Sequence, residues 1–278
     1  MRILVTGSSG RVGQAVAAHL NKHHKIVGID QTPGKHTSVM GDIRDEALMA
    51  QQIENIDAVI HLASLHAPHV GNASRVDFES INVAATAQLL ALARKARVRR
   101  FLLASTTSIY GHAMNNKSFA VWVTEALQPE PADIYDETKL KAEALCAAAF
   151  SPDFITASLR LSRCFPEPVR ETALYRLYRG VDLRDVSQAF ELTLRAMPSQ
   201  FETFNISGDT PFQENDCVAL KQNAATVLKK RVANIEADFL RQGWTFPSQI
   251  DRVYVIEKAK QQLGYAPQFG YKEFMNAL

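Results

Sequence analysis

Short apolar segments alternate with longer segments of helical periodicity through the first two thirds of the chain. This alternation is typical of a parallel sheet whose strands are joined by helices on both faces. We therefore expect an α/β fold built on a doubly wound parallel sheet. The expected strands lie near Arg2–Val5, Lys25–Asp30, Ser38–Met40, Ala58–Ala63, Arg100–Ala104, Phe154–Leu161 and Thr203–Ile206.

Two of the expected helices are long, from about Val76 to Ala96 and from about Ile134 to Ala149, and the first is rich in alanine and leucine. Both carry apolar residues on more than one face. Their own sheet can cover only part of this apolar surface. We therefore expect these helices, residues 76–96 and 134–149, to form the interface of a homodimer.

The helical rhythm breaks around Phe165-Pro166-Glu167-Pro168, and after Gly208 the composition becomes more polar. Further helices are expected near Asn215–Lys229 and Val255–Leu263. The breaks predict a main domain formed by residues 1–162 and 183–207. Residues 163–182 and 208–278 would form a small C-terminal lobe that faces the substrate.

A glycine-rich run from Thr6 to Gly13 follows the first expected strand and opens a helical pattern. In such a turn one glycine permits the tight change of direction, one lets the backbone approach a pyrophosphate, and one lets the helix pack closely on its strand. The N-terminus of the helix adds free N–H groups and the positive end of its dipole. The run therefore predicts a cradle for the phosphates of a dinucleotide.

The second expected strand ends on an acid, Asp30, which lies seventeen positions after Gly13. A carboxylate at about this distance binds the ribose hydroxyls of a dinucleotide. It would also repel a 2′-phosphate, and no arginine follows it immediately. These features favour NAD over NADP, while Arg11 in the loop and Lys35 further on are the cations that would favour NADP.

The charged residues are nearly balanced, with 31 Lys and Arg against 29 Asp and Glu and a formal net charge of +2. No single-sign field is available to attract nucleic acid or an anionic membrane, so we expect small-molecule chemistry. No apolar run approaches the roughly eighteen residues of a membrane span, and we expect no leader segment. Cys146, Cys164 and Cys217 lie far apart, without the spacing of metal ligands, which is typical of the reducing cytosol. We expect a cytoplasmic protein with no metal site.

Tyr135 and Lys139 stand four residues apart at the start of a helical pattern, so they share one helix face. A positive charge about 4 Å from the phenol, at an effective dielectric near 20, contributes roughly the 4 kcal/mol that a tyrosine needs to act as a base near neutral pH. A cluster of hydroxyls follows the strand that ends near Ala104, at the sheet edge where ligands bind. Ser105 or Thr106 could hold a substrate oxygen there while the phenolate takes its proton.

With these motifs in this order, the chain resembles the short-chain dehydrogenase/reductase superfamily, in its extended branch, the NAD-dependent epimerase/dehydratase family. The resemblance covers nearly the whole length. It rests on six segments, namely Thr6 to Gly13, Gly41-Asp42-Ile43, His61-Leu62-Ala63-Ser64, Asn82-Val83, Ser105 to Gly111, and Tyr135 to Lys139.

The resemblance implies a Rossmann-like NAD-binding domain and assigns catalytic roles to Thr106, Tyr135 and Lys139. His61, inside an apolar strand, is instead expected to be a hydrogen-bonded core residue. The implied cofactor-binding residues are Gly7, Gly10, Arg11, Val12, Gly13, Asp30, Asp42, Ile43, Leu62, Ala63, Ser64, Asn82, Ser105, Tyr135 and Lys139.

The substrate contacts that the resemblance implies are less specific, with His66, Thr107, Arg163 and Arg170 as the candidates and arginines 160, 176 and 179 as further possible anion binders. Only about twenty residues separate Leu161 from Asp182, whereas members that act on nucleotide sugars generally carry a longer insertion there. This short segment disfavours a bulky nucleotide-linked substrate. Cys164 to Pro168 is similar to the corresponding part of uronate dehydrogenases, which oxidise free sugar acids.

The motif set supports hydride transfer at a secondary alcohol of a sugar or sugar-derived substrate, with NAD as the cofactor. Three functions remain open at this point. An epimerase or dehydratase would use the step transiently, and a uronate or aldose dehydrogenase would release oxidised product. A nucleotide-sensing protein would keep the fold without turnover, although such relatives typically lack the Tyr and Lys pair.

Overall fold

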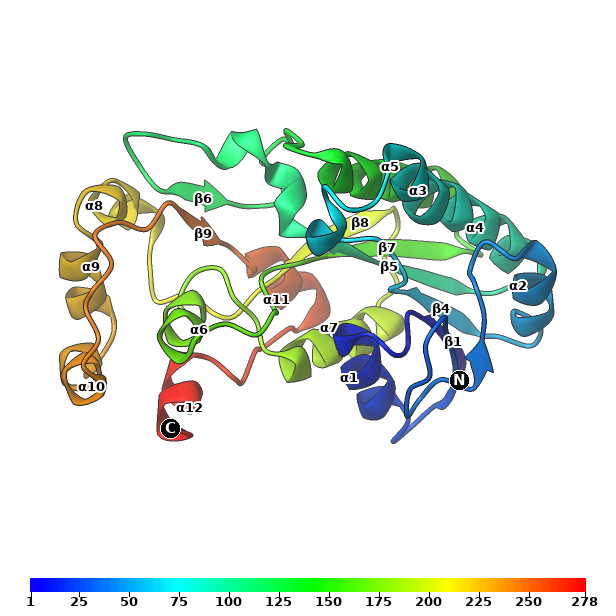
Figure 1. Cartoon of the computed structure of the whole chain (residues 1–278), viewed down its shortest axis with the longest axis horizontal. Helices are drawn as coiled ribbons and strands as arrows, with labels where there is room; N and C mark the ends of the chain where they lie inside the picture. Colours follow the sequence, from blue (N-terminus) through cyan, green and yellow to red (C-terminus); the bar gives the residue numbers. More distant parts are fainter.

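Seven parallel strands form one sheet in a computed structural model that describes residues 1–278 (Figure 1). The strand order is β3-β2-β1-β4-β5-β7-β8, so the direction of winding reverses between β1 and β4. This is the doubly wound arrangement that the sequence predicts. The strands are β1 (Arg2–Thr6), β2 (Lys25–Asp30), β3 (Val39–Met40), β4 (Ala58–His61), β5 (Arg100–Thr106), β7 (Ile155–Leu161) and β8 (Glu202–Ile206), each within two residues of its expected bounds.

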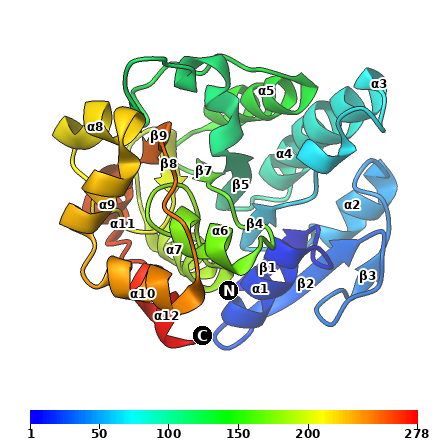
Figure 2. The ribbon, with the colours of Figure 1, turned by 60° about the vertical axis from the view of Figure 1, so that its left-hand side comes forward.

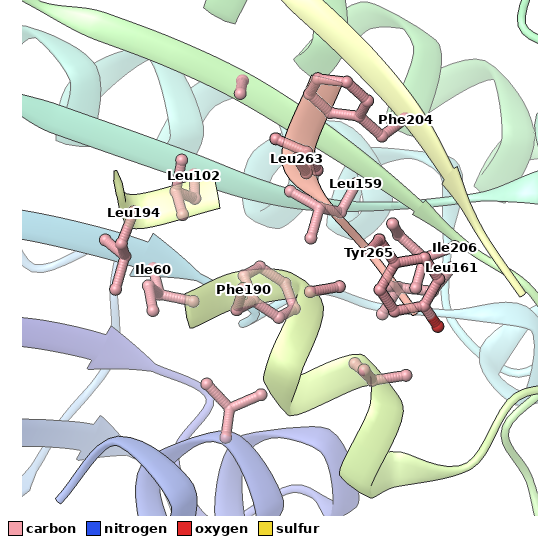
Figure 3. Close-up of a cluster of buried hydrophobic side chains, with 14 of the residues drawn as sticks. Ile60, Leu102, Leu159, Leu161, Phe190, Leu194, Phe204, Ile206, Leu263 and Tyr265 are labelled. Atoms are coloured by element: carbon pink, nitrogen blue, oxygen red, sulfur yellow. The ribbon is translucent and has the colours of Figure 1, made fainter. Parts of the chain in front are cut away.

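Helices cover both faces of the sheet, which is why most of its strand residues are apolar and buried. Successive strand residues point to opposite faces, so Ile3 and Val5 join one buried cluster and Leu4 joins the other. The first cluster packs the sheet against α1 (Arg11–Leu20), α7 (Leu183–Arg195) and α11 (Glu257–Leu263). Figure 3 shows its centre, where Phe190 of α7 lies among strand side chains such as Ile60.

The second cluster packs the other face against α2 (Glu46–Gln52), α4 (Ala85–Lys95) and α5 (Ile134–Ala149). The helix α5 has the bounds that the sequence predicts. The other expected long helix is interrupted: α3 (Arg75–Phe78) continues through a π-helical turn at Glu79–Ala84 before α4 begins. Such turns are rare and often lie at functional sites.

A third buried cluster forms a separate lobe beside the sheet (Figure 2). It contains the helices α6 (Val169–Tyr175), α8 (Cys217–Gln222), α9 (Ala224–Arg231), α10 (Ile235–Gln242) and α12 (Tyr271–Asn276). Two strands of three residues each, β6 (Val121–Val123) and β9 (Arg252–Tyr254), pair in parallel between this lobe and the main sheet. Short 3-10 turns occur at Ala67–His69, Thr107–Tyr110, His112–Met114 and Glu214–Asp216.

The sequence predicts that the chain passes between the main domain and the lobe three times, at residues 162, 182 and 207. In the structure, further segments cross between the two parts. Ala120, within the expected main domain, packs in the cluster of the lobe. Ile256 and Tyr265, within the expected lobe, pack in the cluster beneath the sheet. No helix is both long enough and apolar enough to cross a membrane.

Candidate active site

Two glycines of the loop between β1 and α1, Gly7 and Gly13, lie too close to the neighbouring backbone for a residue with a Cβ. Gly7 has a φ of 71°, a left-handed conformation that favours glycine. A Cβ on Gly13 would lie 2.0 Å from the carbonyl oxygen of Gly7. Gly10 is the N-cap of α1, and Gly10 and Val12 line a large cavity. The N-terminus of α1 therefore opens into that cavity.

This cavity of about 910 Å³ lies at the carboxyl ends of the parallel strands. Gly7 follows β1 and Leu62 follows β4, so the cavity lies where the strand order reverses, the usual ligand position in doubly wound sheets. The structure brings most of the sequence-predicted site residues together here. Those in its wall are Gly7, Gly10, Arg11, Val12, Gly13, Asp30, Asp42, Ile43, Leu62, Ala63, Ser64, His66, Ser105, Thr106, Thr107, Tyr135 and Arg163.

Asp30 presents a carboxylate to the cavity at the end of β2. It accepts hydrogen bonds from Ser9 N and from Thr32 N, both at 3.0 Å, and these donors are uncharged. Asp42 differs, because it forms an ion pair with Arg44 at 2.5 Å, and the hydrogen bond from Arg44 holds the pKa of Asp42 below its usual range. The glycine-rich loop leaves space that a Cβ would fill, and Asp30 beside it has no cation to balance its charge. This arrangement fits a dinucleotide without a 2′-phosphate.

Tyr135 and Thr106 bring a phenol and a hydroxyl into the cavity from two elements. Tyr135 lies in the first turn of α5, whose N-cap Asp133 accepts a hydrogen bond from Asp136 N at 3.0 Å. Thr106 ends β5, and its hydroxyl oxygen accepts a hydrogen bond from Ser108 N at 3.1 Å. Burial raises the pKa of the Tyr135 phenol, while its interaction with the Thr106 hydroxyl lowers that pKa. The phenol therefore holds its proton at neutral pH beside a group that favours its ionised form.

Lys139 lies one turn after Tyr135 on α5 and outside the cavity wall, with 3% of its surface exposed. Burial lowers the pKa of its ammonium to about 8, against the opposing charges of Cys146 and Glu143. The sequence predicts that this ammonium is the main group tuning Tyr135. The hydroxyl of Thr106 is a nearer group that also lowers the pKa of the phenol.

Asn82, a predicted cofactor contact, is also outside the cavity wall and is 2% exposed. Its Oδ1 accepts a hydrogen bond from Leu65 N at 2.8 Å, and its Nδ2 donates to Leu65 O at 2.9 Å and to Thr138 Oγ1 at 3.0 Å. Both amide donors are therefore used within the protein. The structure corrects the prediction: Asn82, in the π-helical turn, holds the loop after β4 against α5.

The structure also corrects the predicted substrate contact of Arg170. Its guanidinium donates to Thr245 O at 2.9 and 3.1 Å and pairs with Glu171 at 2.8 Å, so it is used within the lobe and does not line the cavity. Arg160 and Arg176 are likewise paired internally. Their partners are Glu143 and Asp182.

Ser162 and Arg252 are among the polar wall residues that the sequence-based predictions did not name. Ser162 directly follows β7, at the carboxyl edge of the sheet where ligands bind. This position in the sequence could have identified it as a candidate site residue. Arg252 lies on β9, whose three residues give no recognisable period. The hydroxyls of Ser162 and Ser105, each residue 4% exposed, have no hydrogen-bond partner within the protein.

His66 lines the cavity in an aromatic setting. Its ring stacks on Phe165, with 5.9 Å between centroids, and meets the edge of His69 at 4.5 Å. Burial, and then the charge of His69, lower the pKa of His66. The imidazole is therefore neutral at neutral pH.

His61 confirms its expected role in the core. It is 1% exposed, and its ring nitrogens lie 2.7 Å from Thr6 Oγ1 and 3.0 Å from Thr86 Oγ1. Burial lowers the pKa of His61 to about 3. It is a neutral residue that joins β4, β1 and α4.

Comparison with known proteins identifies the family. Residues 3–171 match the family model described as the NAD dependent epimerase/dehydratase family. The matched segment is more than half of the chain. It contains the glycine-rich loop, Asp30, Thr106, Tyr135 and Lys139.

Individual relatives are distant. A UDP-glucose 4-epimerase from Klebsiella pneumoniae is 33% identical over 129 residues, 40% of this chain and 93% of that protein. A uronate dehydrogenase from Pseudomonas putida is 26% identical over 179 residues, 60% of this chain and 62% of that protein. Further curated relatives are matched over 51% and 46% of their length.

A solved short-chain dehydrogenase/reductase superfamily protein from Agrobacterium tumefaciens, with bound NAD, has the same fold. The TM-score is 0.75 at 23% identity, over 100% of this chain and 95% of that chain. This likeness agrees with the strand order and with the cavity at the reversal point. The chain therefore belongs to the NAD-dependent epimerase/dehydratase family and is an NAD-dependent enzyme.

Proposed function

We propose that this protein transfers a hydride between NAD and a secondary alcohol of a compact sugar or sugar-derived substrate. One observation carries the proposal. The Thr106 hydroxyl and the Tyr135 phenol meet in the wall of a cavity whose other end is the glycine-rich cradle. An alcohol oxidation requires this combination of a bound dinucleotide and a group that manages the hydroxyl proton.

The cofactor would be held by the residues at the cradle end. Gly7, Gly10 and Gly13 with the N-terminus of α1 would bind its pyrophosphate, and Asp30 would bind ribose hydroxyls. The chemistry that NAD would supply when held there is hydride transfer to and from the carbon that carries the alcohol.

The residues of the chain handle the proton. Thr106 would donate a hydrogen bond to the substrate oxygen, and Tyr135 would take the proton from that oxygen in oxidation or give one to a carbonyl oxygen in reduction. Lys139, one turn after Tyr135 on α5, would contribute a positive charge behind the cavity wall. Its pKa of about 8 keeps it mostly protonated at neutral pH. Its ammonium would favour the phenolate, which accepts the proton in oxidation and forms again when the phenol gives its proton in reduction.

The size of the cavity supports a compact substrate. Pockets of about 300–1,000 Å³ hold one drug-sized ligand, and this cavity of about 910 Å³ lies within that range, so a bound dinucleotide would leave room only for a small second molecule. The short segment between β7 and α7 closes its lobe side with Ser162, Arg163 and Phe165. We therefore favour a free sugar or sugar acid, as in the name of the Pseudomonas putida relative, over a nucleotide sugar.

The test is NADH formation across free aldoses, uronic acids and nucleotide sugars. A dehydrogenase accumulates one NADH per product, which supports the proposal. An epimerase or dehydratase converts its substrate without net formation of NADH. That result would agree with the chemistry of the family but contradict a dehydrogenase. A protein that binds NAD and converts nothing on such a panel would be a sensor.

We further propose that the protein is a cytoplasmic homodimer that associates through the segments 76–96 and 134–149. Both segments keep partly buried apolar side chains, such as Ile81, Leu92 and Leu145, and Val76 is 75% exposed. Light scattering after size-exclusion chromatography measures the mass directly. A dimer that Val76→Lys converts to monomer supports this interface.

A further inference from the structure

We propose that Asp136 is a positioning residue, which holds the Thr106 hydroxyl against the Tyr135 phenol by joining the turn after β5 to the first turn of α5. It acts through a neighbouring serine, Ser108. The proposal rests on the proposed function, because Thr106 and Tyr135 are the pair that would manage the substrate proton there.

Asp136 directly follows Tyr135 in α5 and is 2% exposed. Its Oδ1 accepts a hydrogen bond from Ser108 Oγ, and its Oδ2 accepts one from Ala132 N at 3.1 Å. A buried carboxylate needs such partners, because burying an unpaired one is costly. The side chain therefore joins three parts of the chain, namely the turn after β5, the segment that enters α5, and α5 itself.

Ser108 connects this carboxylate to Thr106. It lies in the 3-10 turn Thr107–Tyr110, whose N-cap is Thr106. The Ser108 N–H donates to Thr106 Oγ1 at 3.1 Å, while the Ser108 hydroxyl donates to Asp136. Because the Thr106 oxygen accepts the bond from Ser108, the proton of the Thr106 hydroxyl is left for the phenol or for a substrate oxygen.

A second contact fixes the far end of the same turn. Gly111 follows the turn with a φ of 44°, and a Cβ there would lie 2.1 Å from Glu130 O. His112 N donates to the same carbonyl oxygen at 2.8 Å. Asp136 acts at the near end, beside Thr106. Loss of its link should therefore loosen the turn where it carries the hydroxyl and leave the other end attached.

Helix capping does not explain Asp136, because Asp133 already has that role. The Asp133 side chain accepts a hydrogen bond from Asp136 N at 3.0 Å, which is the usual contact of an N-cap residue with the third residue of its helix. An acid in the first turn also interacts favourably with the helix dipole, but that interaction does not require burial. The buried contact with Ser108 therefore has a separate role.

The charge of Asp136 acts on the phenol as well. Burial raises the pKa of the Tyr135 phenol, and the Thr106 hydroxyl lowers it. Three titratable groups around the phenol raise its pKa further, namely Asp136, Cys164 and Asp133. Removal of the carboxylate therefore changes both the link and the charge. Ser108→Ala breaks the link from the other side and leaves the carboxylate in place, so this variant isolates the positioning.

The first experiment measures kcat, KM and the pH profile with NAD and the best substrate of the panel. We expect Asp136→Ala and Ser108→Ala each to lower kcat by about tenfold or more, with KM for NAD within about twofold. In Ser108→Ala the ionisation that controls kcat/KM in oxidation should move to higher pH, because a loosened Thr106 lowers the phenol pKa less. The double variant should lose no more than the worse single variant, since both remove one link.

Two conservative variants should retain most of kcat. Ser108→Thr keeps the hydroxyl, and Asp136→Asn keeps the link, because its amide can accept from Ala132 N and donate to Ser108 Oγ. Asp185→Asn is the matched control. Asp185 is 1% exposed, accepts hydrogen bonds from two backbone N–H groups and lies outside the cavity wall, so its replacement should leave kcat unchanged.

The second experiment does not depend on turnover. Amide hydrogen exchange, followed by NMR in the protein without substrate, reports the Ser108 N–H that binds Thr106 and the Ala132 N–H that binds Asp136. We expect both amides to exchange at least about tenfold faster in Asp136→Ala, while the amides within β5 keep their rates. A general loss of stability would speed exchange in β5 as well.

Unchanged kcat in folded Asp136→Ala overturns the positioning role, and so does an equal loss in Asp185→Asn. A loss of kcat without a shift of the pH profile in Ser108→Ala, or without faster exchange at Ser108 in Asp136→Ala, also overturns it. Turnover that requires Tyr135 but not Asp136 leaves the proposed function standing. If no substrate of the panel is converted, the proposed function fails, and the exchange at Ser108 still decides whether Asp136 holds the turn.

Discussion

Glu143 and Arg160 form a buried ion pair between α5 and β7, with 2.7 Å between Oε2 and Nη2. Arg160 Nη1 also donates to the Tyr110 hydroxyl at 2.9 Å, and that hydroxyl donates to Asn205 Oδ1 at 2.8 Å. The network joins α5, which carries Tyr135, to β7, β8 and the turn after β5. It fixes the helix that carries the phenol relative to the strand ends that form the cavity.

Breaking this pair from one side is expected to be strongly destabilising. Glu143→Leu leaves the Arg160 charge buried without a partner, so we expect it to lower the free energy of unfolding by about 3–5 kcal/mol. The double variant Glu143→Leu/Arg160→Met removes both charges and should lose less than either single variant. Urea unfolding followed by circular dichroism measures all three. Losses that simply add in the double variant would show that the two residues are not coupled.

Replacing Lys139 is expected to stabilise the protein while reducing its activity. Burial lowers the Lys139 pKa from 10.5 to about 8, so the charged form costs about 3 kcal/mol of folding free energy at pH 7. Between pH 8 and 10.5 the unfolded chain binds more protons than the folded one, so this cost disappears as the pH rises through that window. Lys139→Met removes it at every pH.

Thermal unfolding at pH 7 and pH 10 tests this account of Lys139. The stability advantage of Lys139→Met should be largest at pH 7 and should shrink toward pH 10. Lys141→Met is a matched control, because Lys141 is exposed on the same helix and pairs with Glu79. An advantage that is equal at both pH values would contradict the burial of a charged ammonium.

The parts of the site that were predictable from the sequence depend on local chain geometry. The glycine-rich turn, the acid that ends β2 and the helix α5 each follow from spacing over a few residues. A Cβ at Gly13 would meet the Gly7 carbonyl whatever the rest of the fold does. The alternation of apolar strands and helical segments likewise determines the layers of the sheet.

The errors concern side chains whose partners lie far along the chain. Arg170 donates to the carbonyl of Thr245, a residue of the lobe that no local pattern connects to it. Asn82 lies in a π-helical turn, and its amide forms hydrogen bonds with the backbone of Leu65. The sequence pattern does not indicate this turn. The strands β6 and β9 have three residues each, too few to show a period of two.

Asp30→Ala is expected to relax the discrimination against NADP. The carboxylate would repel a 2′-phosphate, and its removal takes away that repulsion together with the ribose hydrogen bond. We expect the ratio of kcat/KM for NAD to that for NADP to fall by about tenfold or more. Asp42→Ala is the control, because Arg44 already compensates its charge. A protein that prefers NADP before any substitution would contradict the role of Asp30.

Removing the Thr106 hydroxyl is expected to shift the pH profile as well as the rate. Thr106 lowers the pKa of the Tyr135 phenol, so Thr106→Val should raise it and move the ionisation that controls kcat/KM in the oxidation direction to higher pH. Ser105→Ala is the matched control at the neighbouring hydroxyl. A shift in the Ser105 variant and none in Thr106→Val would transfer the role to Ser105.

The most direct test of the account is the turnover of Tyr135→Phe with NAD and the best substrate of the panel. The phenylalanine keeps the ring and removes the hydroxyl proposed to exchange the substrate proton, so we expect kcat to fall by at least about a hundredfold while the affinity for NAD stays within about twofold. Tyr254→Phe, which removes another phenol from the same cavity wall, should keep most of the activity. Equal turnover in Tyr135→Phe and the unsubstituted protein would contradict the central claim.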